Sequence, residues 1–226
     1  MTAGFRILRR ARKVGPEIVQ QFAGLPVANV SDGMSRMTGG GTNLRPMYAG
    51  GTILAGPALT VKSRPGDNLM LHKALDLAEA GDVVVVDAGG DLTNSLMGEL
   101  MHAYAEKKGV AGIVLYGAIR DSAYIRASRF PIFACGITHR GPYKDGPGEI
   151  NVPIAVEGMV IQPGDLVLGD DDGVVCVPFD DCERVLAATK TKHEAETRQM
   201  ESILAGSNDR AWVDAALKRL NCEMQN

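Results

Sequence analysis

The sequence predicts an α/β fold built on a parallel sheet. Residues 82–87 (DVVVVD) and 112–116 (GIVLY) are short apolar runs, typical of strands that are buried on both faces. A β-rich stretch at 51–63 precedes them, and helical patterns separate the three runs. This alternation of strand and helix is typical of a parallel sheet with crossover helices.

The two crossover helices have recognisable ends. The first covers residues 68–79. The second is expected to start at a cap on Asn94 or Ser95, to run to about Lys108 and to end at Gly109. The strand at 112–116 follows, and the chain then reaches Arg120 and Asp121.

The second half of the chain has a different character. Brief strands separated by Gly-, Pro- and Asp-rich turns predict a compact antiparallel meander or barrel, at 130–134, 149–156, 159–161, 165–168 and 173–177. Helical patterns flank the strands on both sides, at 16–22 and 26–37 before them and at 180–205 and 209–220 after them. We therefore expect a single domain over 1–226, with N-terminal helices and a C-terminal helical extension over about 180–226.

Composition excludes several classes of protein. A length of 226 residues and a hydrophobic content of 45% suit one globular domain with a full core. The net charge of −3 comes without a long run of one sign, which argues against nucleic acid or an anionic membrane as a partner. The four cysteines form no CxxC pair, and no secretory or membrane-spanning stretch is recognisable. These features predict a cytoplasmic protein with reduced thiols.

Arg120 and Asp121 are the strongest candidates for catalytic residues. They follow a buried strand, and ligands of α/β proteins bind at the carboxyl ends of strands, where helix N-termini also point. A guanidinium can grip a carboxylate or an enolate, and a single carboxylate is a suitable ligand for Mg²⁺ or Mn²⁺. The alternative is structural, with Asp121 capping a helix and Arg120 in a surface ion pair.

The segment Gly98-Glu99-Leu100-Met101 is the expected partner of this pair. A glycine inside a helix is unfavourable, so Gly98 has either a packing role against the sheet or lets a substrate anion approach the free amides. Glu99 is either a second acid near the metal or an exposed first-turn carboxylate. HExxH, GxSxG and GxGxxG patterns are absent from the sequence, so it gives no support to a zinc-protease, serine-hydrolase or dinucleotide site.

Three stretches together resemble a known family: GGDLTNSLMGELM, GVAGIVLYGAIRDS and GPGEINVPIAVEGMVIQPGDLVLGDDDGVVCVP. They are similar to the RraA-like family over roughly residues 26–178. That family includes the regulators of ribonuclease E activity and the metal-dependent 4-hydroxy-4-methyl-2-oxoglutarate / 4-carboxy-4-hydroxy-2-oxoadipate aldolases. The resemblance implies an α-β-β-α sandwich like the swivelling phosphohistidine domain, assembled as trimers or hexamers with sites between subunits.

The resemblance also implies roles for individual residues. Arg120 would hold pyruvate and its enolate, Asp121 would ligate Mg²⁺ or Mn²⁺, and the backbone of Gly98, Glu99, Leu100 and Met101 would bind the substrate carboxylate. The family pattern has an acid at position 124, where this chain has Tyr124. This departure bears on aldolase activity and not on the fold.

The resulting hypothesis is a divalent-metal-dependent lyase that cleaves small 4-hydroxy-2-oxo acids to pyruvate, with oxaloacetate decarboxylation as a side activity. The alternative is a non-catalytic regulator that binds a ribonuclease or another protein. Because the family's site borrows a glutamate from a neighbouring subunit, Glu194 or Glu196 is expected to approach the Arg120-Asp121 cleft of an adjacent chain.

Overall fold

The computed structural model describes residues 3–37, 40 and 42–224 of the chain. Its strands are β1 (Phe5–Ile7), β2 (Arg45–Pro46), β3 (Leu54–Ser63), β4 (Val83–Asp87), β5 (Ser95–Met97), β6 (Gly112–Ile119), β7 (Ile132–Ile137), β8 (Gly148–Ile150), β9 (Ile154–Val156), β10 (Met159–Ile161), β11 (Leu166–Asp170) and β12 (Gly173–Val177). Its helices are α1 (Pro16–Phe22), α2 (Val27–Gly33), α3 (Leu69–Leu77), α4 (Glu99–Lys107), α5 (Ser122–Ala127), the 3₁₀ turn η1 (Phe179–Asp181), α6 (Cys182–Leu204) and α7 (Ala211–Arg219).

The main sheet confirms the predicted α/β class. Its strand order is β1-β8-β3-β4-β6-β7-β2, and the four central strands β3, β4, β6 and β7 are mutually parallel. Every residue of β4 is buried, as the apolar run predicted. The sheet as a whole is mixed, because β2 pairs antiparallel with β7 and β8 pairs antiparallel with β3.

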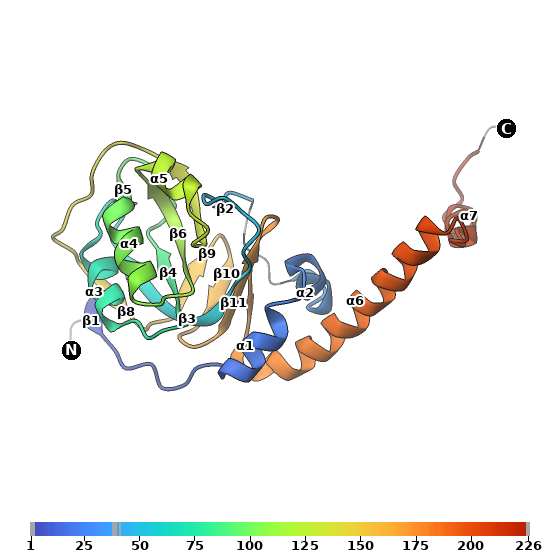
Figure 1. Ribbon diagram of the computed structural model, residues 1–226, viewed down its shortest axis with the longest axis horizontal. Coiled ribbons are helices and arrows are strands. Elements are labelled where there is room, and N and C mark those ends of the chain that lie inside the picture. Colours follow the sequence, from blue (N-terminus) through green and yellow to red (C-terminus); the bar gives the residue numbers. More distant parts are fainter. Residues whose placement is uncertain (1–2, 38–39, 41, 225–226) are drawn as a thin grey trace.

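Helices cover one face of this sheet and further strands cover the other (Figure 1). Side chains alternate along β4, so Val84 and Val86 pack with α3 and α4, whereas Val83 and Val85 face the β9–β12 region. The outer side of β11 and β12 packs in turn against α1, α2 and α6. The order of layers is thus helices, main sheet, outer strands, helices. The likeness to the swivelling phosphohistidine domain stays a prediction.

The strands after β7 differ from a continuous meander. The expected strand 149–156 is split into β8, which joins the main sheet, and β9, which pairs with β10 in a separate hairpin. Asn151 lies between them in the left-handed region (φ 58°), and its N–H donates to the Thr60 carbonyl. This turn redirects the chain from one sheet to the other. The second hairpin, β11–β12, attaches to β3.

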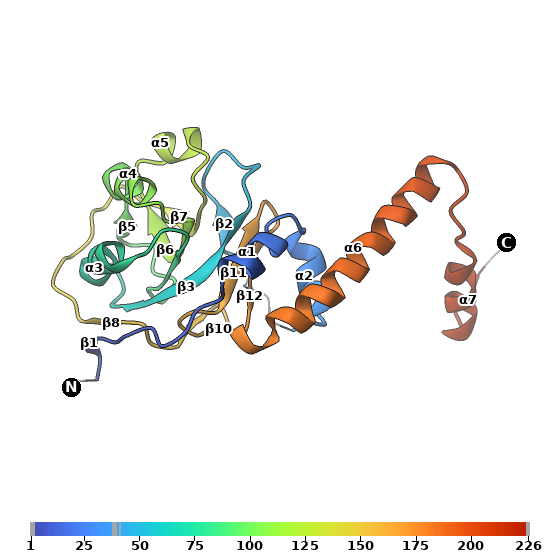
Figure 2. The same cartoon turned by 60° about the horizontal axis from the view of Figure 1, so that its bottom comes forward.

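The predicted C-terminal helices are confirmed, as α6 and α7. The first part of α6 packs on α1 and α2, and its later part extends away from the sheets with α7 at its far end (Figures 1 and 2). Apolar side chains remain exposed on this extension, including Leu204 and Trp212. Within the described residues, no helix combines the length and apolar character that crossing a membrane requires.

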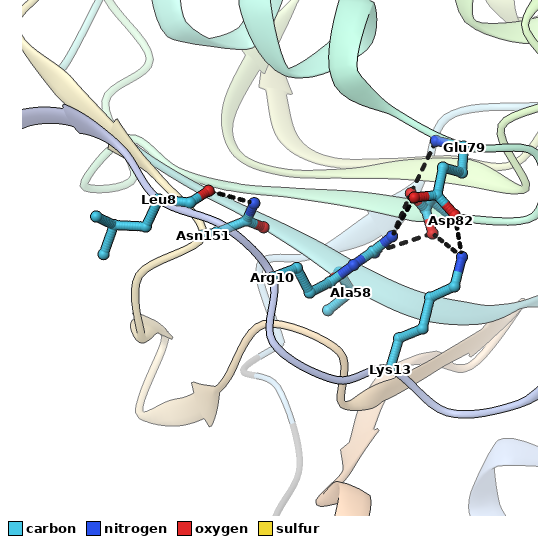
Figure 3. Close-up of polar contacts among 7 residues, drawn as sticks. All are labelled: Leu8, Arg10, Lys13, Ala58, Glu79, Asp82 and Asn151. Carbon is cyan, nitrogen blue, oxygen red and sulfur yellow. Dashed lines mark hydrogen bonds and ion pairs between the residues drawn. The ribbon is translucent and has the colours of Figure 1, made fainter.

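The N-terminal segment is tied to the main sheet by ion pairs (Figure 3). Arg10 forms two contacts of 2.9 Å with the carboxylate of Asp82, whose side chain is fully buried. Asp82 also accepts the Glu79 N–H at 2.9 Å, and Lys13 binds Glu79 at 2.5 Å. This network fixes the segment that runs from β1 to α1.

Candidate active site

Arg120 and Asp121 lie directly after β6, in the centre of the sheet, as predicted. The Arg120 N–H donates to the Met97 carbonyl at 2.9 Å, which fixes the backbone beside β5. Asp121 has left-handed backbone geometry (φ 54°), which aspartate tolerates better than most residues. The chain turns sharply there, and α5 begins at Ser122.

The expected start of the second crossover helix was wrong. Asn94 and Ser95 do not cap it; residues 95–97 instead form β5, which pairs with the end of β6, and α4 begins at Glu99 with Gly98 as its N-cap. The helix still ends at Lys107, just before Gly109 with its φ of 77°, close to the expected end. The late start places the first turn of α4 beside Asp121.

Asp121 and the start of α4 are in direct contact. Asp121 Oδ2 accepts the Glu99 N–H at 3.0 Å and lies 3.6 Å from Arg120 Nε. For the next two N–H groups, those of Leu100 and Met101, the described part of the chain supplies no acceptor. The start of α4 therefore keeps hydrogen-bonding capacity for an anion.

Gly98 has a steric reason to be glycine. It is not inside the helix, and its φ of −147° is open to any residue, so backbone freedom is not the cause. A Cβ at this position would overlap the Asp121 carboxylate and lie 2.9 Å from Arg120 Cγ. The close neighbours are thus side chains of the site itself, a reason that differs from both alternatives considered from the sequence; the approach of a substrate anion stays a prediction.

A cavity of about 280 Å³ opens beside these residues. One part of its wall is formed by Arg120, Asp121 and the segment 97–101, with the exception of Glu99. The remainder is formed by residues that the sequence analysis did not single out as functional, namely Asn68, His72, Ser95, Leu96, Gly141, Pro142 and Lys144. Asn68 resembled an ordinary helix cap, and Lys144 lies in a Gly/Pro loop without a recognisable motif, so neither carried a signal.

The loop that carries Lys144 is anchored by side chains of neighbouring segments. Asn94 donates its side-chain N–H to the Gly141 carbonyl, and Ser95 Oγ donates to the Arg140 carbonyl at 2.9 Å. The buried carboxylate of Asp67 accepts the backbone N–H groups of residues 145 and 146, each at 2.8 Å. The cavity wall is thus held by many contacts rather than by the loop's own sequence.

The charge of the cavity is positive on two sides. Arg120 contributes one cation and Lys144 another. The pKa of His72 is lowered from 6.5, first by burial and then by the charge of Lys144. His72 is accordingly neutral at pH 7. The cavity thus combines two cationic side chains with the one carboxylate of Asp121, which suits a substrate with more than one carboxylate.

A second, more open hollow of about 460 Å³ lies on the other side of Asp121. Glu99, Tyr124 and His139 are among the residues that line it. The ring of Tyr124 contacts the buried His102 edge-on, with centroids 5.2 Å apart. Tyr124 therefore borders Asp121, in the region where the resemblance leads us to expect an acid.

Comparison with known proteins decides the family. A family model described as RraA-like, aldolase/RraA, matches residues 27–176. The chain belongs to this RraA-like family. It is 38% identical over 187 residues to a putative 4-hydroxy-4-methyl-2-oxoglutarate aldolase of Halalkalibacterium halodurans, covering 83% of this chain and 89% of the relative.

Solved structures of family members agree with the fold. The RNA-processing inhibitor RraA from Thermus thermophilus superposes with a TM-score of 0.63 at 31% identity, covering 68% of this chain and 92% of that one. RraAS2 from Streptomyces coelicolor, described as an unusual member of the RNase ES inhibitor RraA family, gives 0.74 at 28% identity, with coverage of 82% and 96%. The family thus contains proteins named as aldolases and proteins named as RNA-processing inhibitors.

The donor groups at the RraA-like site suit only a cation that keeps most of its water ligands. Among the described residues, no cluster of three or more His, Cys, Asp or Glu side chains could enclose a metal ion. Asp121 offers a partly exposed carboxylate whose Oδ1 has no hydrogen-bond or ion-pair partner in the described ranges. One hard oxygen ligand completed by water and substrate is compatible with Mg²⁺ or Mn²⁺ and unsuited to zinc.

The two candidate glutamates of α6, Glu194 and Glu196, have different surroundings. Glu196 accepts a hydrogen bond from Asn29 at 2.6 Å and pairs with Lys192 at 3.0 Å; the Asn29 hydrogen bond is the main cause of its lowered pKa. Glu194 is exposed. Glu196 is thus engaged within its own chain, which leaves Glu194 as the freer candidate for a neighbouring site. That contact between chains stays a prediction.

Proposed function

We propose that this protein is a divalent-metal-dependent lyase that cleaves small 4-hydroxy-2-oxo acids to pyruvate. The observation that carries the proposal is the meeting of Arg120, Asp121 and the start of α4 at one cavity. Two backbone N–H groups there lack acceptors within the described chain, and a guanidinium lies beside them. This arrangement suits a 2-oxo carboxylate, and the relative from Halalkalibacterium halodurans carries the name of a putative aldolase for such an acid.

In this proposal the backbone N–H groups of Leu100 and Met101 bind the substrate's 1-carboxylate. Arg120 contacts the oxygen at C2, where negative charge develops when the bond between C3 and C4 breaks. The electron pair of that bond moves to C3 and the C2 oxygen as an enolate, the C4 hydroxyl loses its proton to water, and C3 later takes up a proton to give pyruvate. A guanidinium that binds the developing charge more strongly than the neutral oxo group lowers the barrier.

Asp121 is the residue that would hold the cation. When bound, Mg²⁺ or Mn²⁺ supplies Lewis-acid stabilisation of charge on the substrate oxygens. Tyr124 carries a phenol in place of a carboxylate, so we expect weaker cation affinity than an acid at this position would give. Replacing Tyr124 by Glu is expected to tighten Mg²⁺ binding and to raise pyruvate formation.

We further infer a single domain with a C-terminal helical extension, assembled as a homotrimer or homohexamer. Several large apolar side chains near the site are exposed in the isolated chain, among them Leu100, Tyr104, Tyr124 and Ile137. Exposed apolar groups at a functional edge are typical of a surface covered by another subunit. Glu194 of a neighbouring chain would complete the site. Light scattering that shows a monomer at micromolar concentration would refute this assembly.

Pyruvate release from 4-hydroxy-4-methyl-2-oxoglutarate and from oxaloacetate tests the lyase proposal. Activity should require Mg²⁺ or Mn²⁺ and disappear with EDTA. Asp121→Ala should abolish cation binding in calorimetry, whereas Arg120→Ala should reduce turnover and leave cation binding intact. Arg126→Ala, an exposed arginine on α5 away from the cavity, is the matched control. Equal pyruvate release with and without EDTA would contradict the metal requirement, and full cation affinity in Asp121→Ala would contradict the site.

The alternative is a non-catalytic regulator that binds a ribonuclease. Two observations favour keeping it: the likeness to proteins named as RNA-processing inhibitors, and Tyr124 in place of the expected acid. A direct binding assay with a purified RNase E-type nuclease distinguishes the two functions. Nuclease binding combined with no measurable Mg²⁺ affinity and no pyruvate formation would favour the regulator.

A further inference from the structure

The last helix, α7, has an apolar side that its own chain leaves uncovered. Figure 2 shows α7 at the far end of α6, away from both sheets. None of its nine residues is buried, and the side chains of Trp212 and Leu220 are in positions that are 65% and 66% exposed. A helix this short is only marginally stable in water by itself, because most helical stability in proteins comes from packing. We therefore expect α7 to pack against another surface.

The domain of the same chain does not provide that surface. α6 ends in an ordered turn, in which the Gly206 N–H donates to the Ile203 carbonyl at 3.0 Å and the Ser207 N–H donates to the Ser202 carbonyl at 2.9 Å. With this turn, α7 lies beyond the end of α6 and apart from the other helices (Figures 1 and 2). Leu204, just before the turn, is 82% exposed. The surface that covers α7 thus belongs to another molecule.

The apolar side of α7 is complementary to a second copy of itself. Trp212, Ala216 and Leu220 are spaced four residues apart, so they lie along one side of the helix. Asp209, just before the helix, and Arg219, in its last turn, border the same side with opposite charges. Within the described part of the chain, Arg219 has no ion-pair partner.

An antiparallel arrangement of two α7 helices satisfies size and charge together. In one register the large Trp212 of each copy lies over the small Ala216 of the other copy. The same register places Asp209 of each copy opposite Arg219 of the other, and the two-fold symmetry makes every contact twice. A parallel pair would instead bring like charges together at both ends.

We propose that α7 pairs antiparallel with the α7 of a second copy of this chain, with Trp212 over Ala216 and Asp209 opposite Arg219. This pairing is independent of the lyase function and uses a surface other than the apolar side chains near the cavity. Nine helical residues span only about 14 Å, and the contact is smaller than the about 1,200 Å² that stable interfaces bury. We therefore expect pairing that depends on protein concentration and that strengthens other contacts between the same subunits.

Trp212 is the only tryptophan of the chain, so its fluorescence reports directly on the pairing. As the concentration of the full-length protein rises, its emission should shift to shorter wavelength and its quenching by acrylamide should decrease. Arg219→Glu should weaken the pairing about tenfold, because both contacts with Asp209 change from attraction to repulsion. Lys218→Glu makes the same change one residue earlier, on the opposite side of the helix, and is the matched control with unchanged pairing.

Mixing two variants identifies the partner. Asp209→Lys alone should also weaken the pairing, because the new lysine faces Arg219. An equimolar mixture of Arg219→Glu and Asp209→Lys should restore it, since every contact between the two variants again joins opposite charges. This recovery is specific to the pairing of α7 with α7.

A second variant leaves the start of the helix intact. Asp209 Oδ1 accepts the Ala211 N–H at 2.8 Å, so Asp209→Lys also removes a contact at the helix start. Ala216→Gln places a larger side chain where Trp212 of the other copy lies, and it should abolish the concentration-dependent shift in emission. Ala215→Gln, one residue earlier and outside the apolar side, should not.

Three results would overturn the proposal. One is a Trp212 that stays accessible to acrylamide at every concentration of the wild-type protein. Another is a Trp212 that stays protected in Arg219→Glu and in Ala216→Gln, which would place α7 on a different surface of a neighbouring subunit. The third is protection that requires phosphatidylglycerol vesicles, which would show that α7 binds a membrane surface instead.

Discussion

Replacing Asp67 by Asn should destabilise the protein more than any surface change of the same chemistry. The Asp67 side chain is fully buried between α3 and the loop at 138–148. Oδ1 accepts the Leu69 N–H at 2.9 Å, and Oδ2 accepts the N–H groups of Asp145 and Gly146 at 2.8 Å each. Both oxygens therefore face backbone donors, and Arg64 lies 3.4 Å from Oδ2.

The magnitude follows from this geometry. An asparagine has one acceptor oxygen, so its NH₂ group must face at least one backbone N–H, and one or two hydrogen bonds to a charged group are lost. Each such bond contributes about 1.5–3 kcal/mol, so the free energy of unfolding should fall by about 1.5–6 kcal/mol. For a chain of this size the melting temperature falls by about 2–4 °C per kcal/mol. The loop that carries Lys144 should also become mobile, which raises KM for diacid substrates.

Urea denaturation followed by circular dichroism measures this effect, with Asp76→Asn as the control. Asp76 is a half-exposed aspartate on α3; it accepts a hydrogen bond from Tyr104 and lies 3.9 Å from Lys73. The Asp76→Asn substitution should lower the free energy of unfolding by less than about 1 kcal/mol, because exposed ion pairs usually contribute no more than that. A loss for Asp67→Asn that is no larger than that for Asp76→Asn would refute the argument that the buried carboxylate anchors the loop.

Three further substitutions test other parts of the structure. Gly98→Ala should lower Mg²⁺ affinity in calorimetry and activity in pyruvate assays, each at least tenfold, with little loss of stability. The reason is that the new Cβ displaces the Asp121 carboxylate. Wild-type activity in this variant would contradict the steric argument. Arg10→Met leaves Asp82 buried without its main partner and should cost about 3 kcal/mol in urea denaturation (Figure 3); a loss below about 1 kcal/mol would contradict it. Burial lowers the pKa of His102 below 6.5, so the unfolded chain binds this proton more readily and stability is lost as the pH falls below about 6.5. His102→Phe should reduce the difference in unfolding free energy between pH 7.5 and pH 5.5 by about 1 kcal/mol at most, and an unchanged difference would show that other groups cause it.

The sequence predicted the central parallel strands because their signal is local. A run of β-branched residues such as Val83–Asp87 is buried on both faces, and its composition alone indicates this. Residues 95–97 carry no such signal: three residues of strand are too short for a periodicity, and Ser95 is also a good helix cap. Their extended conformation comes from pairing with the end of β6, a contact between segments more than 20 residues apart.

The candidate site shows the same division between local and long-range information. Arg120, Asp121 and the start of α4 could be found because they follow a strand and match a family pattern. Asn68 and Lys144 reach the cavity only through the folding of α3 and the loop at 138–148 around it. Nothing in the neighbouring sequence of either residue distinguishes it from a helix cap or a surface lysine, so the three-dimensional structure was needed to identify them.

Asp121 meets two demands, and the geometry around it allows both to be met at once. Oδ2 caps α4 through the Glu99 N–H, which stabilises the helix start and holds the carboxylate in place. A bound cation needs the same carboxylate, and Oδ1 is available to it without loss of the cap. A side chain at position 98 would push the carboxylate off the helix start, and a helix beginning at Asn94 or Ser95 would carry that start away from β6. The glycine, the short strand β5 and the left-handed turn at Asp121 therefore act together, since each is needed for one carboxylate to cap a helix and face a ligand at the same time.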